Sequence, residues 1–353
     1  MKVCQAFTQL GHEVTLIVPE TPGFFESQPD MMAHYGLTTP FTIDSLPVRS
    51  RRLFPWIAVF KARSLRTGIL YVWPPQSAVL GLLARLPVML EMHDLPSGWL
   101  GPLWYRGFLI LPGKKRLLPI TQALKDALDE RFHVRLPDEQ VTIAPDGVDL
   151  ERYDSLLDPE IVRRDLNLPL APTVLCTGHL YAGRGAELFL GLAAKFPQAS
   201  FVWVGGRPRD VEFWSTQASE RKISNITFTG FIPNQHIPHY QAAADVLLMP
   251  YGRTVSASSG GNTADVCSPM KMFEYMAAGR AILTSDLPVL HEILDETMAV
   301  FCPPEDPSLW ESELKMLLGD PKRRITLGQR ARSASTQYSW LERAKRILEN
   351  FNT

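Results

Sequence analysis

Short apolar runs recur along this chain, and segments with helical spacing separate them. Most of the runs are continuous or rich in β-branched residues, which is typical of parallel strands buried on both faces. Helical segments such as residues 122–132 and 184–195 alternate with the runs, as in βαβ units. We therefore predict an α/β protein with two doubly wound, Rossmann-like domains. The predicted strands are residues 14–18, 69–73, 88–92, 117–120, 141–144, 173–177, 201–204, 226–228, 246–249, 281–284 and 299–301.

A capped helix is predicted between Ser268 and Gly279. Ser268 is a good N-cap, Pro269 suits the first helical position, and Gly279 is a natural stop. Lys271 and Glu274 lie three residues apart and so share a face of this helix. Free N–H groups and Lys271 are suited to phosphate oxygens, and Glu274 to ribose hydroxyls. The alternative is an ordinary amphipathic helix with a surface Lys–Glu pair.

The segment resembles the donor site of a known enzyme family. Its sequence, Ser-Pro-Met-Lys-Met-Phe-Glu-Tyr, matches a variant motif (Ser-Pro-x-Lys-x-Phe-Glu-Tyr) of the retaining family 4 glycosyltransferases, which have the GT-B fold. The resemblance implies two domains with a cleft between them and donor contacts from Ser268, Pro269, Met270, Lys271 and Glu274. It also gives Glu274 a catalytic role.

The better-known form of the motif has two glutamates with seven residues between them. Glu274 matches the second, but the first falls on Val266. The neighbouring Asp265 is a candidate substitute for the contact to the donor sugar hydroxyls.

A glycine-rich loop, residues 178–185, follows the predicted strand at 173–177. Such a turn at a strand end is a common phosphate-binding position. In the family an Arg and a Lys of this loop grip the diphosphate, and here His179 and Arg184 stand in their places. We therefore expect donor contacts from Gly178, His179 and Arg184, with His179 only partly charged near neutral pH.

Three further positions complete the expected site. The resemblance places Gly205 close to the donor and the backbone around Ile232 at the nucleotide base, although turn formation alone could explain both segments. His93 follows a predicted strand of the first domain, and the matching family histidine approaches the donor sugar across the cleft. The alternative for His93 is a structural histidine held by Asp94.

The chain is long enough for two domains. We assign residues 1–150 to an N-terminal acceptor domain and residues 151–337 to a C-terminal donor domain, with the boundary near the Pro-Asp-Gly-Val-Asp turn at 145–149. By family analogy a final helix within residues 338–353 returns to the first domain. By the same analogy a first strand and a glycine-rich loop should come before the predicted helix at 3–10, and neither is in the sequence. Either the reading frame extends upstream of Met1 or the first sheet lacks a central strand. Because a missing internal strand would expose two ladder edges, we expect the reading frame to extend upstream.

Composition indicates a soluble globular protein, with 45% apolar residues, 21% charged residues and a net charge of −1. No apolar run reaches the roughly 18–20 residues that a membrane span needs. The four cysteines are scattered without metal-ligand spacing, which favours reduced thiols in the cytoplasm. We expect no metal and no cofactor beyond the nucleotide diphosphate sugar as co-substrate.

Charge is distributed unevenly. Between Ser45 and Lys125 there are twelve Lys and Arg residues but only two acids, Glu91 and Asp94. Large aromatic residues, including Trp56 in this region, alternate with the basic ones, a pattern that suits peripheral binding to an anionic membrane surface. One alternative is nucleic acid, although no recognised binding motif accompanies the charge. The other is a solvated basic face with its aromatic residues in the core.

Together these features predict a metal-independent glycosyltransferase that moves a sugar from a nucleotide diphosphate sugar to a glycan or lipid-linked acceptor with retention. The expected location is the cytoplasm or the inner face of the membrane. Two alternatives share the same features: a nucleotide-sugar 2-epimerase and an inactive nucleotide-sugar-binding subunit.

Overall fold

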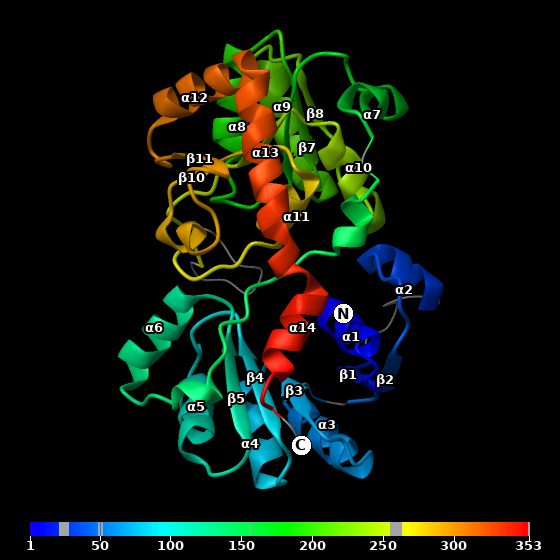
Figure 1. Cartoon of the computed structure of the whole chain (residues 1–353), viewed down its shortest axis with the longest axis vertical. Coiled ribbons are helices and arrows are strands. Elements are labelled where there is room, and N and C mark those ends of the chain that lie inside the picture. Colours follow the sequence, from blue (N-terminus) through cyan, green and yellow to red (C-terminus); the bar gives the residue numbers. More distant parts are fainter. Residues whose placement is uncertain (21–27, 49, 51, 156, 255–262, 352–353) are drawn as a thin grey trace. The chain divides into compact units, whose positions relative to one another are not determined.

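The computed structural model describes residues 1–20, 28–48, 50, 52–155, 157–254 and 263–351, which form two compact units (Figure 1). The first unit comprises Met1–Asp146, Val266–Ser268 and Trp340–Thr353. The second comprises Gly147–Asp265 and Pro269–Ser339.

The first unit contains two parallel sheets among its described residues. One pairs β1 with β2, and the other has the order β3-β4-β5. No described strand joins β1 to β3, and whether a strand precedes Met1 stays a prediction. The elements of this unit are α1 (Lys2–Gln9), β1 (Thr15–Pro19), α2 (Gln28–Tyr35), β2 (Thr42–Leu46), α3 (Phe54–Ser64), β3 (Leu70–Val72), α4 (Pro75–Leu83), β4 (Val88–Met92), α5 (Gly101–Ile110), β5 (Lys115–Pro119), α6 (Gln122–Phe132), η1 (Asp138–Gln140) and α14 (Trp340–Leu348).

Two sequence predictions fail in this unit. Residues 141–144 form only an isolated bridge from Val141 to Leu117, not a strand. Ala144 donates to the carbonyl of Pro119, but proline has no N–H with which to continue the ladder. The strand β2 was not predicted, because its polar residues interrupt the apolar run and its side chains are only partly covered.

The last helix, α14, belongs to the first unit, where it packs against α1. Ala6 of α1 is buried together with Trp340 and Ala344 of α14 in a small apolar cluster. Residues from the two ends of the described chain therefore share one core.

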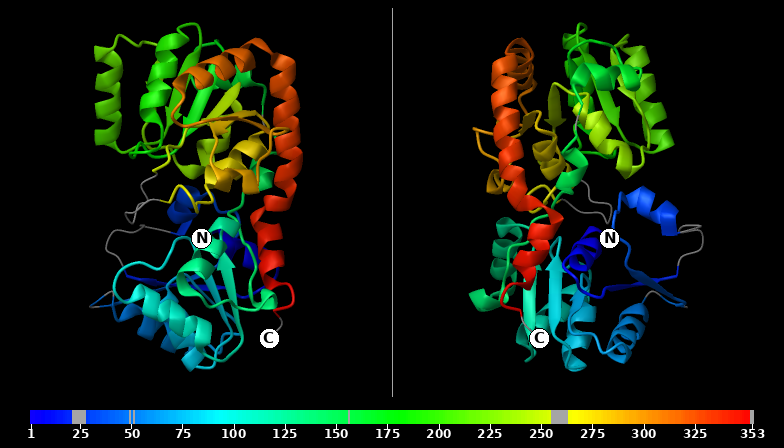
Figure 2. Two further views of the ribbon diagram at one scale, coloured as in Figure 1. Left: turned by 90° about the vertical axis from the view of Figure 1, so that its left-hand side faces the viewer. Right: turned by 45° about the vertical axis from the view of Figure 1, so that its right-hand side comes forward.

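The second unit is a six-stranded parallel sheet with the order β11-β10-β9-β6-β7-β8. Four of its strands, β6, β7, β9 and β10, are buried at every position, and helices cover both faces (Figure 2). The elements are η2 (Leu150–Tyr153), α7 (Pro159–Asp165), β6 (Thr173–Thr177), α8 (Ala186–Lys195), β7 (Ser200–Val204), α9 (Pro208–Glu220), β8 (Ile226–Phe228), η3 (Asn234–His236), α10 (Ile237–Ala242), β9 (Val246–Met249), α11 (Met270–Ala278), β10 (Ala281–Ser285), η4 (Pro288–Glu292), β11 (Ala299–Cys302), α12 (Pro307–Gly319), α13 (Pro321–Ser335) and η5 (Thr336–Tyr338).

The strand order reverses at the centre of this sheet. From β6 the chain builds outward through β7 to β8, then returns to β9 on the other side of β6 and continues to β10 and β11. In open α/β sheets, ligands bind beyond the carboxyl ends of the strands at such a switch point. The topology therefore predicts a ligand site at the loops that follow β6 and β9.

Candidate active site

Two glycines meet at the carboxyl ends of β6 and β7. Gly178 has a φ of +126° and Gly205 a φ of +118°, values that side-chain-bearing residues rarely adopt. A Cβ atom at Gly205 would lie only 2.6 Å from the carbonyl oxygen of Gly178. The indole Nε1 of Trp203 donates to the same oxygen at 2.9 Å. The structure thus brings these two predicted donor residues into direct contact.

The loop after β8 extends this group. Gly230 forms an antiparallel bridge with Gly205, and Ile232 follows two residues later, partly buried. The approach of Ile232 to a nucleotide base stays a prediction.

The predicted helix forms as α11, but its N-cap is not the expected residue. The cap is Pro269, whose carbonyl accepts from the N–H of Met272 at 2.9 Å. The Ser268 hydroxyl instead accepts from the backbone N–H of Asp146 at 3.0 Å, so it does not serve as the cap. At the other end Gly279 adopts the left-handed conformation with a φ of +64°, which confirms the predicted stop.

Lys271 is a buried cation in the first turn of α11. Its Nζ lies 4.7 Å from the centroid of the Tyr251 ring and 3.7 Å from the Cys176 Sγ. Burial, reinforced by the charge of Arg184, lowers the pKa of the ammonium group. Among the described residues no carboxylate forms an ion pair with it. A buried charge in this state favours an anionic ligand, because an unpaired buried ion is costly.

Arg184 brings a second cation to the same aromatic ring. Its guanidinium lies 5.4 Å from the centroid of the Tyr251 ring, and Nη1 donates to the Tyr251 hydroxyl at 3.3 Å. Its Nε is buried and lacks a hydrogen-bond partner within the described part of the chain. Tyr251 follows β9, so two cations converge at the switch point.

His179 stands apart from this cationic pair. Its ring stacks on that of Tyr181 at a centroid distance of 4.8 Å, and the guanidinium of Arg207 lies 5.1 Å from the centroid of the Tyr181 ring. Burial, together with the charges of Arg207 and Arg184, lowers the pKa of His179. Near neutral pH it is therefore mainly a neutral hydrogen-bonding group, not a second diphosphate cation.

Glu274 lies one turn beyond Lys271 and is held by residues that the sequence did not indicate. Gln241 Nε2 donates to Glu274 Oε2 at 3.2 Å, and the Tyr153 hydroxyl donates to Gln241 Oε1 at 2.8 Å. Tyr153 and Gln241 are buried, so the chain of hydrogen bonds restricts the carboxylate. No local motif marks either residue.

Val266 has a packing role. Its side chain is buried in the hydrophobic core of the first unit, and its carbonyl accepts from the Thr121 hydroxyl at 3.0 Å. Asp265, the candidate substitute for the first glutamate, is exposed. The residue that replaces the glutamate therefore belongs to an apolar core.

His93 directly follows β4 in the first unit, and its side chain is 44% exposed. Its Nε2 lies 2.5 Å from Oε1 of Glu91. Asp94 does not hold it: that carboxylate accepts instead from the backbone N–H of Leu95 at 2.7 Å. Burial works against the charged imidazole, but the hydrogen bond and charge of Glu91 outweigh it and raise the pKa of His93.

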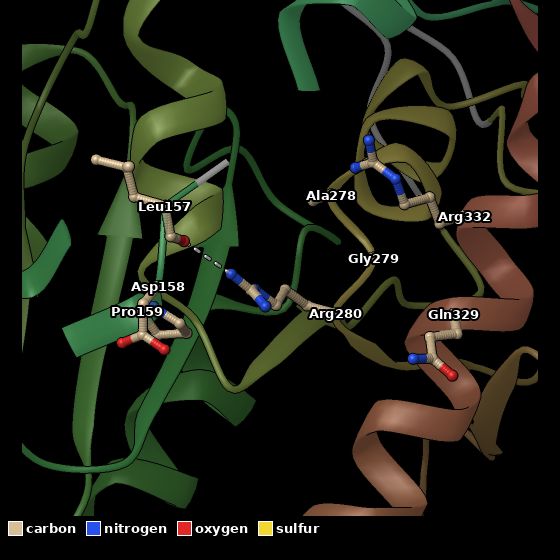
Figure 3. A pocket seen from close by; sticks show the side chains of 8 residues that line it. All are labelled: Leu157, Asp158, Pro159, Ala278, Gly279, Arg280, Gln329 and Arg332. Atoms are coloured by element: carbon tan, nitrogen blue, oxygen red, sulfur yellow. Dashed lines mark hydrogen bonds between the residues drawn. The ribbon is translucent and has the colours of Figure 1, made fainter. Parts of the chain in front are cut away.

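The second unit also has a surface pocket, shown in Figure 3. It is at the carboxyl end of α11, whereas Lys271 is at the amino end. There Arg332 donates to the carbonyl of Ala277 and Arg280 to that of Ala242. Its arginines thus bind backbone carbonyls. The lining residues are Leu157, Asp158, Pro159, Ala278, Gly279, Arg280, Gln329 and Arg332.

Neither a metal-ligand cluster nor a membrane-spanning helix occurs among the described residues. Within those parts of the chain, no three His, Cys, Asp or Glu side chains group as metal ligands do. Over the same residues, no helix is both long and apolar enough to cross a bilayer.

Both units match family models. Residues 1–152 match the model described as Glycosyltransferase Family 4, and residues 171–320 match the model described as Glycosyl transferases group 1.

Curated relatives are similar over part or all of the chain. An alpha-galactosylglucosyldiacylglycerol synthase of Streptococcus pneumoniae is 26% identical, over 45% of this chain and 41% of that protein. A phosphatidyl-myo-inositol mannosyltransferase of Mycolicibacterium smegmatis is 23% identical, over 100% of this chain and 88% of its own length. The chain spans about half or less of the length of the first relatives that it matches.

Among solved structures, Anabaena HepE in complex with UDP and glucose superposes with a TM-score of 0.74 and 16% identity. The match covers 99% of this chain and 95% of that one. This likeness shows the fold.

Proposed function

With glycosyltransferase models matching both of its units, the chain belongs to the family 4 glycosyltransferases of the GT-B fold, and we propose that it transfers a sugar from a nucleotide diphosphate sugar with retention. The second unit supplies the donor site in this proposal. The observation that carries it is the pair of cations, Lys271 and Arg184, on the ring of Tyr251.

The diphosphate fits this pair by charge and by geometry. Lys271 is buried without a carboxylate partner among the described residues, and Arg184 has a buried Nε that nothing there satisfies. The first turn of α11 adds free N–H groups and the positive end of the helix dipole. Gly178 lies beside Lys271, since a Cβ atom at that position would be in van der Waals contact with Nζ at 3.9 Å.

Glu274 is proposed to bind hydroxyl groups of the donor. An ionised carboxylate accepts hydrogen bonds, and the Gln241–Tyr153 chain fixes its orientation. The complex of HepE with UDP and glucose supports a nucleotide sugar as the donor class. Similarity to the galactosylglucosyldiacylglycerol synthase and to the phosphatidyl-myo-inositol mannosyltransferase supports a lipid-linked or glycan acceptor.

In the proposed reaction, the acceptor oxygen forms a bond to the anomeric carbon as the bond from that carbon to the diphosphate oxygen breaks. The acceptor proton passes to the departing diphosphate, so no protein base is required. Negative charge grows on the leaving group, and Lys271, Arg184 and the α11 N–H groups stabilise it without a metal ion. His93 of the first unit is proposed to bind a hydroxyl of the sugar.

The first unit also presents a surface suited to an anionic membrane. At and within α3 the residues Leu53, Trp56, Ile57 and Phe60 have the spacing of one helical face, and all are exposed, Phe60 by 77%. The opposite face of α3 supplies the buried residues, so this exposed face is not used by the core of the unit.

A second exposed group lies at and before α5, which packs on the same helix, α4, as α3 does. It consists of Trp99, Leu100, Leu103 and Ile110, and Trp99 is 87% exposed. Exposed cations accompany both groups: Arg52, Arg63, Arg66, Arg85, Arg106 and Lys114. We refer to these residues together as the basic apolar surface.

The aromatic residues of this region differ in their exposure. Trp56, Phe60 and Trp99 are exposed, whereas Tyr105 and Phe108 lie in the core. Lys115 and Arg116 are also buried and donate to backbone carbonyls, so neither is free to meet lipid. Arg49 and Arg51 lie outside the described residues. Exposed apolar side chains with exposed cations close to them in the sequence favour a surface of anionic lipids, where the protein would meet a lipid-linked acceptor from the cytoplasmic side.

Calorimetric titration with UDP-, GDP- and dTDP-sugars tests the donor site. The wild-type chain should bind one of these classes, and Lys271→Met should weaken that binding by about tenfold or more, the loss expected of a charged hydrogen bond. The exposed Lys315 on α12 provides the control, since Lys315→Met should bind as the wild type does. Equal affinity in the Lys271 variant would refute the site.

Incubation with a labelled donor and a mixture of acceptors then separates the activities. A labelled acceptor product supports transfer. An isomerised sugar would show a nucleotide-sugar 2-epimerase, and binding without turnover would show a binding subunit. Either of the last two results overturns the proposed reaction but leaves the donor site standing.

A further inference from the structure

A buried cluster of charged residues in the first unit is in contact with His93 through Glu91. Glu91, on β4, is 2% exposed, and Arg343, on α14, is equally buried. Arg343 Nη2 and the hydroxyl of Tyr71 both donate to Oε2 of Glu91. These contacts join β3, β4 and α14 at one carboxylate.

Arg343 is itself held by the backbone. Its Nε donates to the carbonyl of Pro145 at 2.8 Å, and Nη2 donates to that of Ala144 at 3.1 Å. The guanidinium therefore has a fixed position before it meets Glu91. Burial of the Glu91 carboxyl opposes its ionisation, but the charge of Arg343 and the contact with His93 outweigh burial and lower the pKa of Glu91.

The state of Glu91 determines which nitrogen of His93 carries a proton. An ionised carboxylate can only accept hydrogen bonds. Because Oε1 of Glu91 lies 2.5 Å from Nε2 of His93, Nε2 must be the protonated nitrogen. The Nδ1 atom makes no hydrogen bond within the described part of the chain. In the neutral imidazole, Nδ1 is thus the nitrogen with a free lone pair.

We propose that Glu91 and Arg343 are positioning residues that fix the Nε2–H tautomer of His93, so that Nδ1 accepts a hydrogen bond from a hydroxyl of the substrate. The inference rests on the proposed function for the role of the hydroxyl, but the tautomer itself is a property of the free protein. It gives α14 a part in the chemistry, because this last helix supplies the cation that keeps Glu91 ionised.

The titration of His93 depends on groups from several elements. Glu91 lies on β4, Arg343 on α14, Tyr71 on β3, and Asp146 follows the segment that Arg343 contacts. The charges of Glu91 and Asp146 favour imidazolium, and that of Arg343 disfavours it. A neutral Nδ1 acceptor is lost on protonation, so transfer should decline as the pH falls through the pKa of His93.

Nitrogen NMR of the imidazole rings tests the tautomer without any need for activity. At a pH above the pKa of His93, where the imidazole is neutral, protein labelled with ¹⁵N-histidine should show the Nε2–H form for His93 in the wild type. Glu91→Gln should lower the pKa of His93 and allow both tautomers, because a neutral amide neither attracts the proton nor requires a donor. His239, in the second unit with a side chain that is 40% exposed, is the control: its ¹⁵N signals should be the same in both proteins.

Glu91→Gln leaves the buried Arg343 without its carboxylate partner, which destabilises the fold. A second variant therefore separates this effect from the loss of the tautomer. The double variant Glu91→Gln/Arg343→Met removes both charges and should reproduce the loss of the tautomer. Arg343→Lys keeps a cation and should retain the Nε2–H form. An Nδ1–H form in the wild type, or an unchanged His93 pKa in both Gln-containing proteins, overturns the proposal.

Kinetics separate this proposal from the proposed function. Glu91→Gln should reduce kcat/KM by about tenfold, the worth of one hydrogen bond to a charged group, and should move the acidic limb of the pH profile to lower pH. If Glu91 had only a structural role, Glu91→Gln would lower the melting temperature and leave the acidic limb of the pH profile unchanged. If His93→Ala transfers sugar at the wild-type rate, the role of His93 fails, although NMR can still establish its tautomer.

Discussion

Gly178 and Gly205 approach so closely that a side chain at position 205 would collide with the Gly178 backbone. A Cβ atom at Gly205 would lie 2.6 Å from the Gly178 carbonyl oxygen and 3.1 Å from its carbonyl carbon. The backbone cannot move aside as a flexible side chain can. The conformation of the glycine-rich loop after β6 therefore depends on the absence of a side chain at Gly205, after β7.

Gly205→Ala should therefore disturb the donor loop and destabilise the second unit. We expect a loss of about 1–3 kcal/mol in the free energy of unfolding, because the change adds both a clash and a strained φ. Urea denaturation measures the loss in the free energy of unfolding. Titration with the donor measures the affinity of the loop for its ligand. Gly191→Ala in α8 is the control: the added methyl group has open space, so that variant should be as stable as the wild type or more so.

Lys271→Met should make the protein more stable while it weakens donor binding. The ammonium is buried without a carboxylate among the described residues, and an unbranched apolar side chain of similar length removes that cost. A gain of about 1 kcal/mol in the free energy of unfolding is expected in the absence of ligand. A decrease, with Lys315→Met unchanged, would mean that Lys271 supports the fold.

Asp146 should make stability depend on pH between about 4 and 6. Burial raises the pKa of its carboxyl from 3.8 to about 6, only partly offset by the charges of His93 and Arg343. The folded state then binds more protons than the unfolded state in this window, so the free energy of unfolding falls as pH rises. Asp146→Asn cannot titrate, and the advantage of the wild type over this variant should shrink by at most about 1.4 kcal/mol per pH unit.

Denaturation of both proteins at several pH values between 4.5 and 7 provides the measurement. A difference between the two proteins that is constant across the range would show that the Asp146 carboxyl titrates normally.

The basic apolar surface should bind vesicles that contain anionic lipid. Co-sedimentation should weaken as salt rises, since charges at a surface are screened over roughly 10 Å at 0.1 M. Phe60→Ala and Trp99→Ala should each reduce binding, whereas Phe213→Ala, at an exposed aromatic of α9, should not. Neutral vesicles should bind less. If all three variants bind anionic vesicles equally well, the proposed membrane surface is wrong.

Transfer should persist after exhaustive chelation. Lys271, Arg184 and the first turn of α11 are proposed to neutralise the diphosphate, so EDTA followed by gel filtration should leave turnover unchanged. A loss that added Mg²⁺ or Mn²⁺ restores would contradict the proposed chemistry.

The second unit could be predicted closely from sequence because its strands are continuous apolar runs. The bounds of β6, β8 and β9 agree with the prediction, and α11 ends at the expected glycine. In the first unit the polar, partly covered β2 gave no such signal. Residues 141–144 were expected as a strand but meet Pro119, which lacks the N–H that a ladder needs.

The candidate site was also predicted only in part from the sequence. Lys271, Glu274 and the glycine loops follow from local spacing and motif. The partners that orient them do not, because Gln241 is 33 residues from Glu274 and Arg343 is 252 residues from Glu91. Such pairs arise only when distant elements pack together, and no local pattern records them.

The return of α14 to the first unit has a consequence for the order in which the protein is made. Apart from three residues, the second unit is continuous from Gly147 to Ser339, so all of its chain emerges from the ribosome before α14 does. The first unit must wait for α14, since until then Glu91 lacks Arg343 and Ala6 lacks its covering residues. Domains often fold from the amino terminus during synthesis; here the unit that is begun first is completed last.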